Sequence, residues 1–192
     1  IDVIITDHHI ISETIPQAVA VVNPKRHDCP SSFDDFAGVG VAFCLLICLR
    51  KKMREIHFWK NRPEPNLKSV CDLVALGTLA DMVPLVDENR ILSRTGLDII
   101  TSSNRPGLNA LIEVSGINKN DVDTDDIVFG LAPRLNSAGR IDDASMAVEL
   151  LTTKNSETAE QIAQSLNHLN QRRRSIENGI IEQIEDQLKK NP

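Results

Sequence analysis

Three polar residues, Asp7, His8 and His9, follow directly on the mostly apolar run from Ile1 to Ile5, and this junction constrains the chain more than any other feature. A short apolar run of this kind predicts a buried strand. A carboxylate and two imidazoles at its end are costly to bury without a partner. Carboxylate and neutral imidazole both bind first-row metals, so a divalent metal would satisfy all three side chains.

The three residues by themselves leave the kind of site open. A phosphate could take the place of the metal, or the side chains could be solvated or hydrogen-bonded within the protein. Side chains alternate along a strand, so His8 and His9 should not share a face unless the chain turns at this point. Without such a turn, at most two of the three residues can be metal ligands.

A single acid, Asp81, lies in the otherwise apolar stretch from Leu73 to Val86. The residues from Leu67 to Leu79 have helical periodicity and predict a core helix, which Asp81 would follow. The carboxylate could simply cap or end that helix. It could instead join His8 as a further metal ligand, and this convergence of two distant residues is the main structural test of a metal site.

Two arginines, Arg134 and Arg140, enclose the residues Leu-Asn-Ser-Ala-Gly. Small residues let a backbone approach a phosphate, and a guanidinium offers the phosphate a two-pronged hydrogen bond. The glycine predicts a turn or loop from Arg134 to Asp143. The alternative is a surface loop in which these arginines pair with Asp126, Asp142 or Asp143.

The composition neither indicates nor excludes a nucleic-acid partner. The 192 residues carry a net charge of −6, and the aromatic residues that could stack on bases are limited to five Phe and one Trp. The four cysteines form no C-x-x-C pair and predict neither a zinc site nor disulfides, so we expect a reducing, cytoplasmic location. The longest apolar run, Val41 to Leu49, is too short to span a bilayer, so we expect no membrane partner.

Strand signals come early in the chain and helix signals dominate later, which predicts an α/β class with a helical second half. The stretch from Gly38 to about Glu55 is apolar on all sides and predicts a buried helix. Strands are expected at residues 1–6 and 18–22, and further helices at residues 67–79, 88–100, 106–114, 123–130 and 144–151.

A long helix, capped by Asn155 or Ser156, is expected to reach about Leu188. Its apolar residues form one narrow stripe, which suits a helix that bridges two domains. The helix also contains the run from Arg172 to Arg174. Such a charge run is usually a solvated face, and Glu177 lies within helical reach of the last two of these arginines.

Three ordered motifs match a known family: Ile4 to His9, Gly77 to Asp81, and Arg134 to Arg140. Together they resemble the DHH phosphoesterase family, and most closely its single-strand-specific 5′-to-3′ DNA exonucleases, over nearly the whole chain. The resemblance implies a DHH-type parallel-sheet domain followed by a helical region and a long connector helix. It places the C-terminal portion of the catalytic domain at residues 1–154 and the interdomain connector at residues 155–192.

The resemblance also implies a catalytic centre that holds two manganese or magnesium ions about 3.5–4 Å apart. His8 would be a metal ligand, and His9 would contact a metal or the phosphate. Asp7 would orient the imidazoles from behind the metal site. Asp81 would be a further metal ligand.

The third motif is implied to bind the phosphates of single-stranded DNA through Arg134, Asn136 and Arg140. Ser137 occupies a position where the family usually has alanine, and we expect no change in the chemistry from this small difference. A helicase and a single-strand-binding protein are the protein partners that the resemblance suggests.

The family's Asp-rich first motif and its second metal-binding aspartate precede the Asp-His-His motif, and the sequence shows no counterpart of either. We therefore expect an internal fragment of such an exonuclease that is inactive by itself. Two alternatives remain: a DHH phosphodiesterase or pyrophosphatase acting on small phosphates, and a non-catalytic DHH replication scaffold. The presence of Asp7, His8, His9 and Asp81 argues against the scaffold, since such relatives tend to lose metal ligands.

Overall fold

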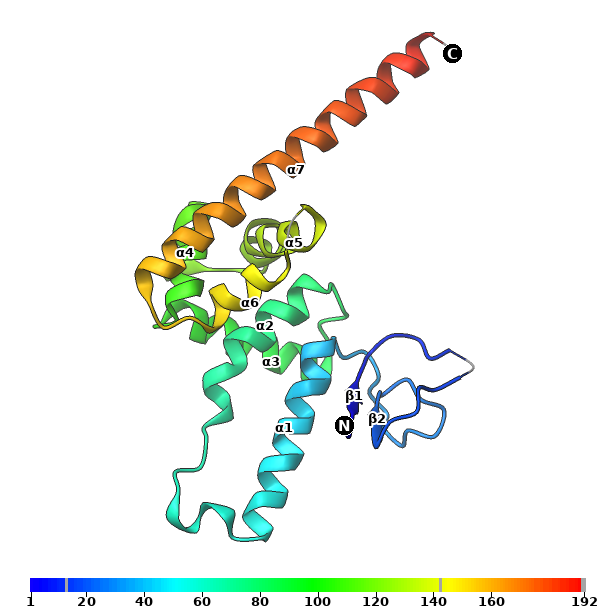
Figure 1. The fold of residues 1–192 in the computed structure, drawn as a ribbon, viewed down its shortest axis with the longest axis vertical. Coiled ribbons are helices and arrows are strands. Elements are labelled where there is room, and N and C mark those ends of the chain that lie inside the picture. Colours follow the sequence, from blue (N-terminus) through cyan, green and yellow to red (C-terminus); the bar gives the residue numbers. More distant parts are fainter. Residues whose placement is uncertain (13, 142, 191–192) are drawn as a thin grey trace. The chain divides into compact units, whose positions relative to one another are not determined.

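The computed structural model of the chain describes residues 1–12, 14–141 and 143–190. Its contacts divide the chain into two compact units, residues 1–100 and residues 101–192. The first unit contains a small parallel sheet and several helices, and the second is helical and ends in a long helix (Figure 1). These features confirm the expected α/β class with a helical second half.

The sheet consists of β1 (Ile4–Thr6) and β2 (Ala20–Val22), which pair in parallel with Ile5 opposite Val21. Both strands are found where they were expected but are shorter. The expectation that the first apolar run is buried was wrong, because the Ile4 side chain is 60% exposed. Within the described residues β2 is the only strand that pairs with β1, so the sheet is too narrow to be covered on both faces.

The helix α1 (Gly38–Glu55) has the predicted limits but not the predicted burial. Its buried residues end at Phe43, and the later apolar residues Leu46, Ile47 and Leu49 are 42–50% exposed. The reason is that only the first turns of α1 face the core, where Phe43 packs with residues of the next long helix.

The remaining helices of the first unit form the core beside α1. They are η1 (Phe58–Asn61), η2 (Leu67–Val70), α2 (Cys71–Ala80) and α3 (Asp87–Thr101). The prediction that α2 is a core helix is confirmed, since most of its residues are buried. Glycines allow the close packing: a Cβ added to Gly77 would lie 2.7 Å from a methyl carbon of Val39 in α1.

The second unit is organised around α7 (Ser156–Lys190), which contacts three of the shorter helices. The Asn155 side chain accepts a hydrogen bond from the Thr158 backbone N–H at 3.0 Å, which confirms Asn155 as the predicted N-terminal cap. The shorter elements are α4 (Pro106–Ser115), η3 (Lys119–Asp121), the π-helical η4 (Asp126–Leu131), α5 (Ala132–Ile141) and α6 (Ser145–Thr152).

The segment from Arg134 to Ile141 was expected to be a loop, and this expectation was wrong because it lies within α5. Pro133 disfavours an α-helix because it clashes with the carbonyl four residues earlier. The wider π-type turn just before it relieves this clash: the Ala132 N–H bonds to the Ile127 carbonyl, five residues back. The small residues of the motif therefore serve helix packing.

Ser137 shows this packing most clearly. Its side chain is fully buried, and its hydroxyl lies 2.6 Å from the Arg134 carbonyl and 3.3 Å from the Leu166 carbonyl of α7. The neighbouring Ala138 is also fully buried. The phosphate-approach role predicted for these small residues is therefore corrected: they let α5 lie close against α7.

The C-terminal part of α7 carries the predicted apolar stripe, and its members are 50–66% exposed: Ile176, Ile180, Ile184 and Leu188. The role of residues 155–192 as an interdomain connector stays a prediction. Among the residues described, no helix combines the length and apolar character that a bilayer-spanning segment needs.

Candidate metal centre

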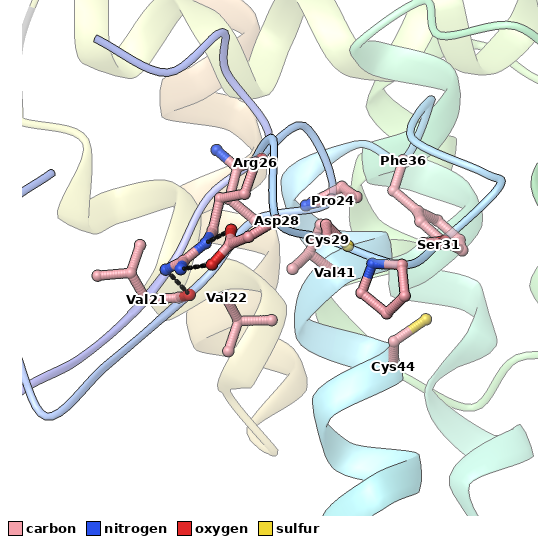
Figure 2. Close-up of a pocket in the computed structure, with 12 residues that line it drawn as sticks. Val21, Val22, Pro24, Arg26, Asp28, Cys29, Ser31, Phe36, Val41 and Cys44 are labelled. Atoms are coloured by element: carbon pink, nitrogen blue, oxygen red, sulfur yellow. Dashed lines mark hydrogen bonds and ion pairs between the residues drawn. The ribbon is translucent and has the colours of Figure 1, made fainter. Parts of the chain in front are cut away.

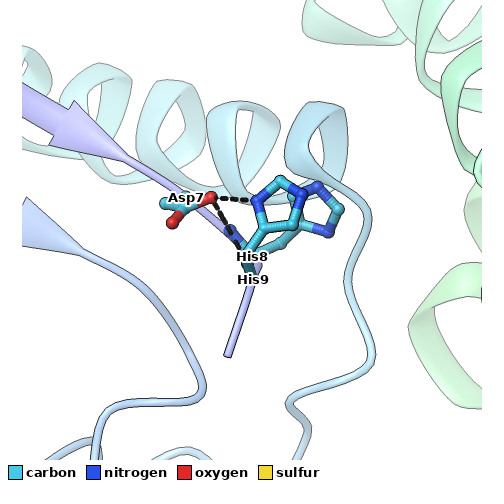
Figure 3. A group of neighbouring side chains, drawn as sticks. All are labelled: Asp7, His8 and His9. Carbon is cyan, nitrogen blue, oxygen red and sulfur yellow. Dashed lines mark hydrogen bonds and ion pairs between the residues drawn. The ribbon is translucent and has the colours of Figure 1, made fainter. Parts of the chain in front are cut away.

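The chain turns sharply where β1 ends, and the Asp7 side chain makes this turn. The Asp7 N–H still bonds to the Val22 carbonyl of β2 at 3.0 Å. The Asp7 carboxylate then accepts the backbone N–H groups of His8 at 2.8 Å and of His9 at 3.3 Å (Figure 3). This is the turn that two adjacent histidines need to share a face, and their ring centroids are 4.2 Å apart.

The same Asp7 oxygen accepts a hydrogen bond from Nδ1 of His9 at 2.7 Å. This bond, followed by the backbone N–H of His8, lowers the pKa of Asp7 from 3.8 to about 2. Asp7 is therefore ionised at neutral pH and holds the proton of His9 on Nδ1. The other ring nitrogen, Nε2, is left to face a metal or a phosphate, as in metal sites where a carboxylate orients an imidazole.

The Asp7 carboxyl carbon is expected to titrate in NMR with a midpoint near 2. Because the folded pKa lies below the unfolded value, the turn's stabilisation is complete above pH 3.8 and is lost as pH falls through about 2. A His9→Ala substitution removes the largest cause and should raise the midpoint. A midpoint that is the same in both proteins would contradict the pairing.

Asp81 lies directly after α2, and its Oδ2 is 3.4 Å from Nδ1 of His8. The next residue, Met82, has a φ of 56°, a left-handed conformation that is unfavourable for residues other than glycine and that ends the helix. The predicted convergence of two residues more than seventy positions apart is thus observed. The two side chains are 19% and 41% exposed, so a solvent ion can reach both.

The donor set fits a first-row divalent ion. The ligand atoms of Asp7, His8 and His9 lie within 4.8 Å of one another. Two ligands bound at about 2.1 Å to one octahedral ion are roughly 3–4 Å apart, which matches the distance between His8 and Asp81. Mixed imidazole and carboxylate donors suit manganese, and carboxylates also suit magnesium.

Two residues that the sequence did not single out as site residues hold the centre in place. Gly38, the first residue of α1, lies against the His8 ring: a Cβ there would be 3.2 Å from its Cδ2. Asn23, which is 5% exposed, donates from its side chain to the His9 carbonyl at 2.9 Å. Asn23 follows β2, and ends of parallel strands share one sheet edge, so this signal was available in the sequence.

The predicted phosphate-binding residues all belong to α5, in the second unit. Arg134 is half-buried and donates to Asn167 Oδ1 at 2.9 Å and to the Gly130 carbonyl at 2.7 Å. Asn136 is exposed. The side chain of Arg140 lies outside the described residues.

The surface-loop alternative for Arg134 is not supported among the described residues. Asp126 and Asp123 cap each other's backbone N–H groups, and Asp143 binds Ser145. Asp142, the other acid considered, lies outside the described residues. Arg134 therefore has polar neighbours but no carboxylate partner within the part of the chain that is described.

A cavity of 440 Å³ lies between the loop after β2 and α1 (Figure 2). Most of its lining is apolar, and Cys29 and Cys44 both contribute to it. Its one cation, Arg26, is paired with Asp28 and also donates to the Val21 carbonyl. The lining therefore offers no unpaired charge that would bind a phosphate.

The comparisons with known proteins agree with this geometry. Residues 1–78 match the DHH family, N-terminal domain. The single-stranded-DNA-specific exonuclease RecJ of Dickeya dadantii (strain 3937) is 48% identical over 94% of this chain and 32% of its own length. RecJ of Escherichia coli (strain K12) is 45% identical over the same shares.

The chain is homologous to RecJ. A crystal structure of exonuclease RecJ bound to manganese has a TM-score of 0.81 at 32% identity, over 97% of this chain and 44% of that one. RecJ from Thermus thermophilus in complex with Mn²⁺ has a TM-score of 0.78 at 32% identity, over 95% and 26%. The chain spans about a third of the length of the curated RecJ relatives, so the similarity concerns only part of a RecJ protein.

Proposed function

We propose that residues 1–192 contribute the Asp-His-His part of a metal-dependent exonuclease that hydrolyses single-stranded DNA from its 5′ end. The observation that carries the proposal is the approach of His8 and Asp81 to 3.4 Å at the end of β1. The similarity to RecJ, at 45–48% identity over 94% of the chain, supports the substrate class.

In this proposal His8 and Asp81 are metal ligands, and His9 contacts a metal or the scissile phosphate. Asp7 keeps the proton on Nδ1 of His9 and fixes the turn that brings both rings to one side. A bound manganese or magnesium ion lowers the pKa of a water molecule and stabilises negative charge on the phosphate oxygens. Arg134, Asn136 and Arg140 bind further phosphates of the strand.

The proposal extends to the setting in which the enzyme works. A single-strand nuclease needs unwound DNA, which a helicase produces and a single-strand-binding protein covers, so both are proposed partners. The proposed location is the cytoplasm, where bacterial DNA lies.

The deciding experiment compares substrates for a protein that carries residues 1–192 within its full-length polypeptide. With manganese present, we expect shortening of a 5′-phosphorylated single strand and no comparable turnover of duplex DNA or a cyclic dinucleotide. Faster turnover of the cyclic dinucleotide would favour a small-phosphate phosphodiesterase and overturn the proposal. Absence of manganese binding in calorimetry would instead support a non-catalytic scaffold.

Residues 1–192 by themselves are expected to bind manganese weakly and not to cleave DNA. The centre at the end of β1 offers two imidazoles and two carboxylates, which is fewer donors than two octahedral ions require. Cleavage by the purified chain that disappears in a His8→Ala variant would show that these four residues suffice.

A further inference from the structure

Arg134 is an unusual cation because it is partly buried without a counter-ion among the described residues. Its guanidinium donates to two neutral acceptors, Asn167 Oδ1 and the Gly130 carbonyl. Burial, and secondly the positive charge of Arg174, lower its pKa from the usual value. A guanidinium in such a position costs free energy that a bound anion would recover.

The face of α7 next to Arg134 carries a second cation. Asn167, which binds Arg134, lies seven residues and about two helical turns before Arg174, so the two project from the same side of α7. Asn170 lies between them and is 3% exposed. Arg134 of α5 and Arg174 of α7 therefore lie along one seam between the two helices.

The neighbouring Arg173 explains why Arg174 is available. Glu177 was within helical reach of both arginines, and in the structure it pairs with Arg173. Arg173 also donates to Asn170 Oδ1 at 3.3 Å and 3.2 Å, so it is fully engaged within α7. Among the described residues no carboxylate pairs with the exposed Arg174.

We propose that Arg174 of the long helix α7 forms, together with Arg134, a phosphate subsite for the single strand, so that α7 is a DNA-binding element as well as a connecting helix. This inference rests on the proposed function, which supplies the ligand class. Two guanidiniums without a carboxylate can share one phosphodiester group, whose oxygens accept several hydrogen bonds at once. In this arrangement Asn167 is a positioning residue that aims Arg134 along the seam.

The test uses Arg174→Gln with Arg172→Gln as a matched control. Arg172 is exposed on the same helix but points about 200° away, and its loss removes the same net charge. Binding of an oligothymidylate to a protein that carries residues 1–192 is measured as a function of salt, without divalent metal to prevent cleavage. Circular dichroism checks that both variants keep their helices.

We expect Arg174→Gln to weaken binding about tenfold and to reduce the slope of log affinity against log salt by about 0.7, the value for one phosphate contact on a single strand. Arg172→Gln should have a much smaller effect. Equal effects of the two variants would overturn the subsite and leave the proposed function standing. If the unmodified protein binds no single strand, the proposed function itself fails and the subsite fails with it.

Discussion

Asp81→Asn is expected to reduce manganese affinity by at least about 100-fold and to abolish phosphodiester hydrolysis by the full-length protein. Loss of a residue that merely orients a metal ligand already costs about 10–100-fold, and Asp81 would be a ligand itself. The substitution preserves size and removes only the charge 3.4 Å from Nδ1 of His8. Isothermal calorimetry with manganese measures the first effect, and single-strand degradation measures the second.

Asp2→Asn is the matched control for this experiment, because Asp2 is exposed in the same unit and its loss changes the net charge equally. It should leave manganese affinity unchanged. A His8→Gln and Asp81→Asn double variant should lose less than the sum of the single losses, since both remove ligands of one ion. Manganese binding by Asp81→Asn equal to that of the unmodified protein would refute the proposed metal centre.

Gly107→Ala is expected to destabilise the second unit by about 3 kcal/mol or more, which is at the upper end of the effects of overpacking. Gly107 lies in α4, and a Cβ there would be 1.7 Å from the Leu150 carbonyl oxygen and 2.6 Å from its carbon. These are backbone atoms of α6, so no side-chain rotation relieves the clash. Urea unfolding monitored by circular dichroism measures the change.

Gly179→Ala is the opposite case and serves as the control. Nothing lies within 4 Å of a Cβ added at Gly179, in the middle of α7, so alanine should stabilise the helix by about 0.5–1 kcal/mol. A similar, small effect of both substitutions would show that α4 and α6 are not packed as closely as described.

Local sequence signals predicted most of the helices in this protein. The Gly38 start of α1, the Asn155 cap of α7 and the core character of α2 follow from capping chemistry and periodicity, which involve only neighbouring residues. The same reasoning failed for α5. Proline, serine and glycine are poor helix formers, yet packing against α7 and the preceding π turn stabilise the helix there.

Burial was less predictable than secondary structure. The apolar composition of β1 and of the second half of α1 indicated a core position, and both are exposed in the structure. Composition shows that a surface is suited to burial, whereas only the arrangement of other elements decides whether something covers it.

For the functional site, the sequence by itself determined the chemistry: a carboxylate and two imidazoles at a strand end, an isolated acid after a core helix, and arginines in a third motif. Only the tertiary structure decided which of these groups meet. It brings Asp81 to His8 across more than seventy residues, and it places Asn23 and Gly38 behind the two rings. The physical reason is that a ligand set depends on distances of a few ångströms, which are fixed by packing between elements far apart in the chain.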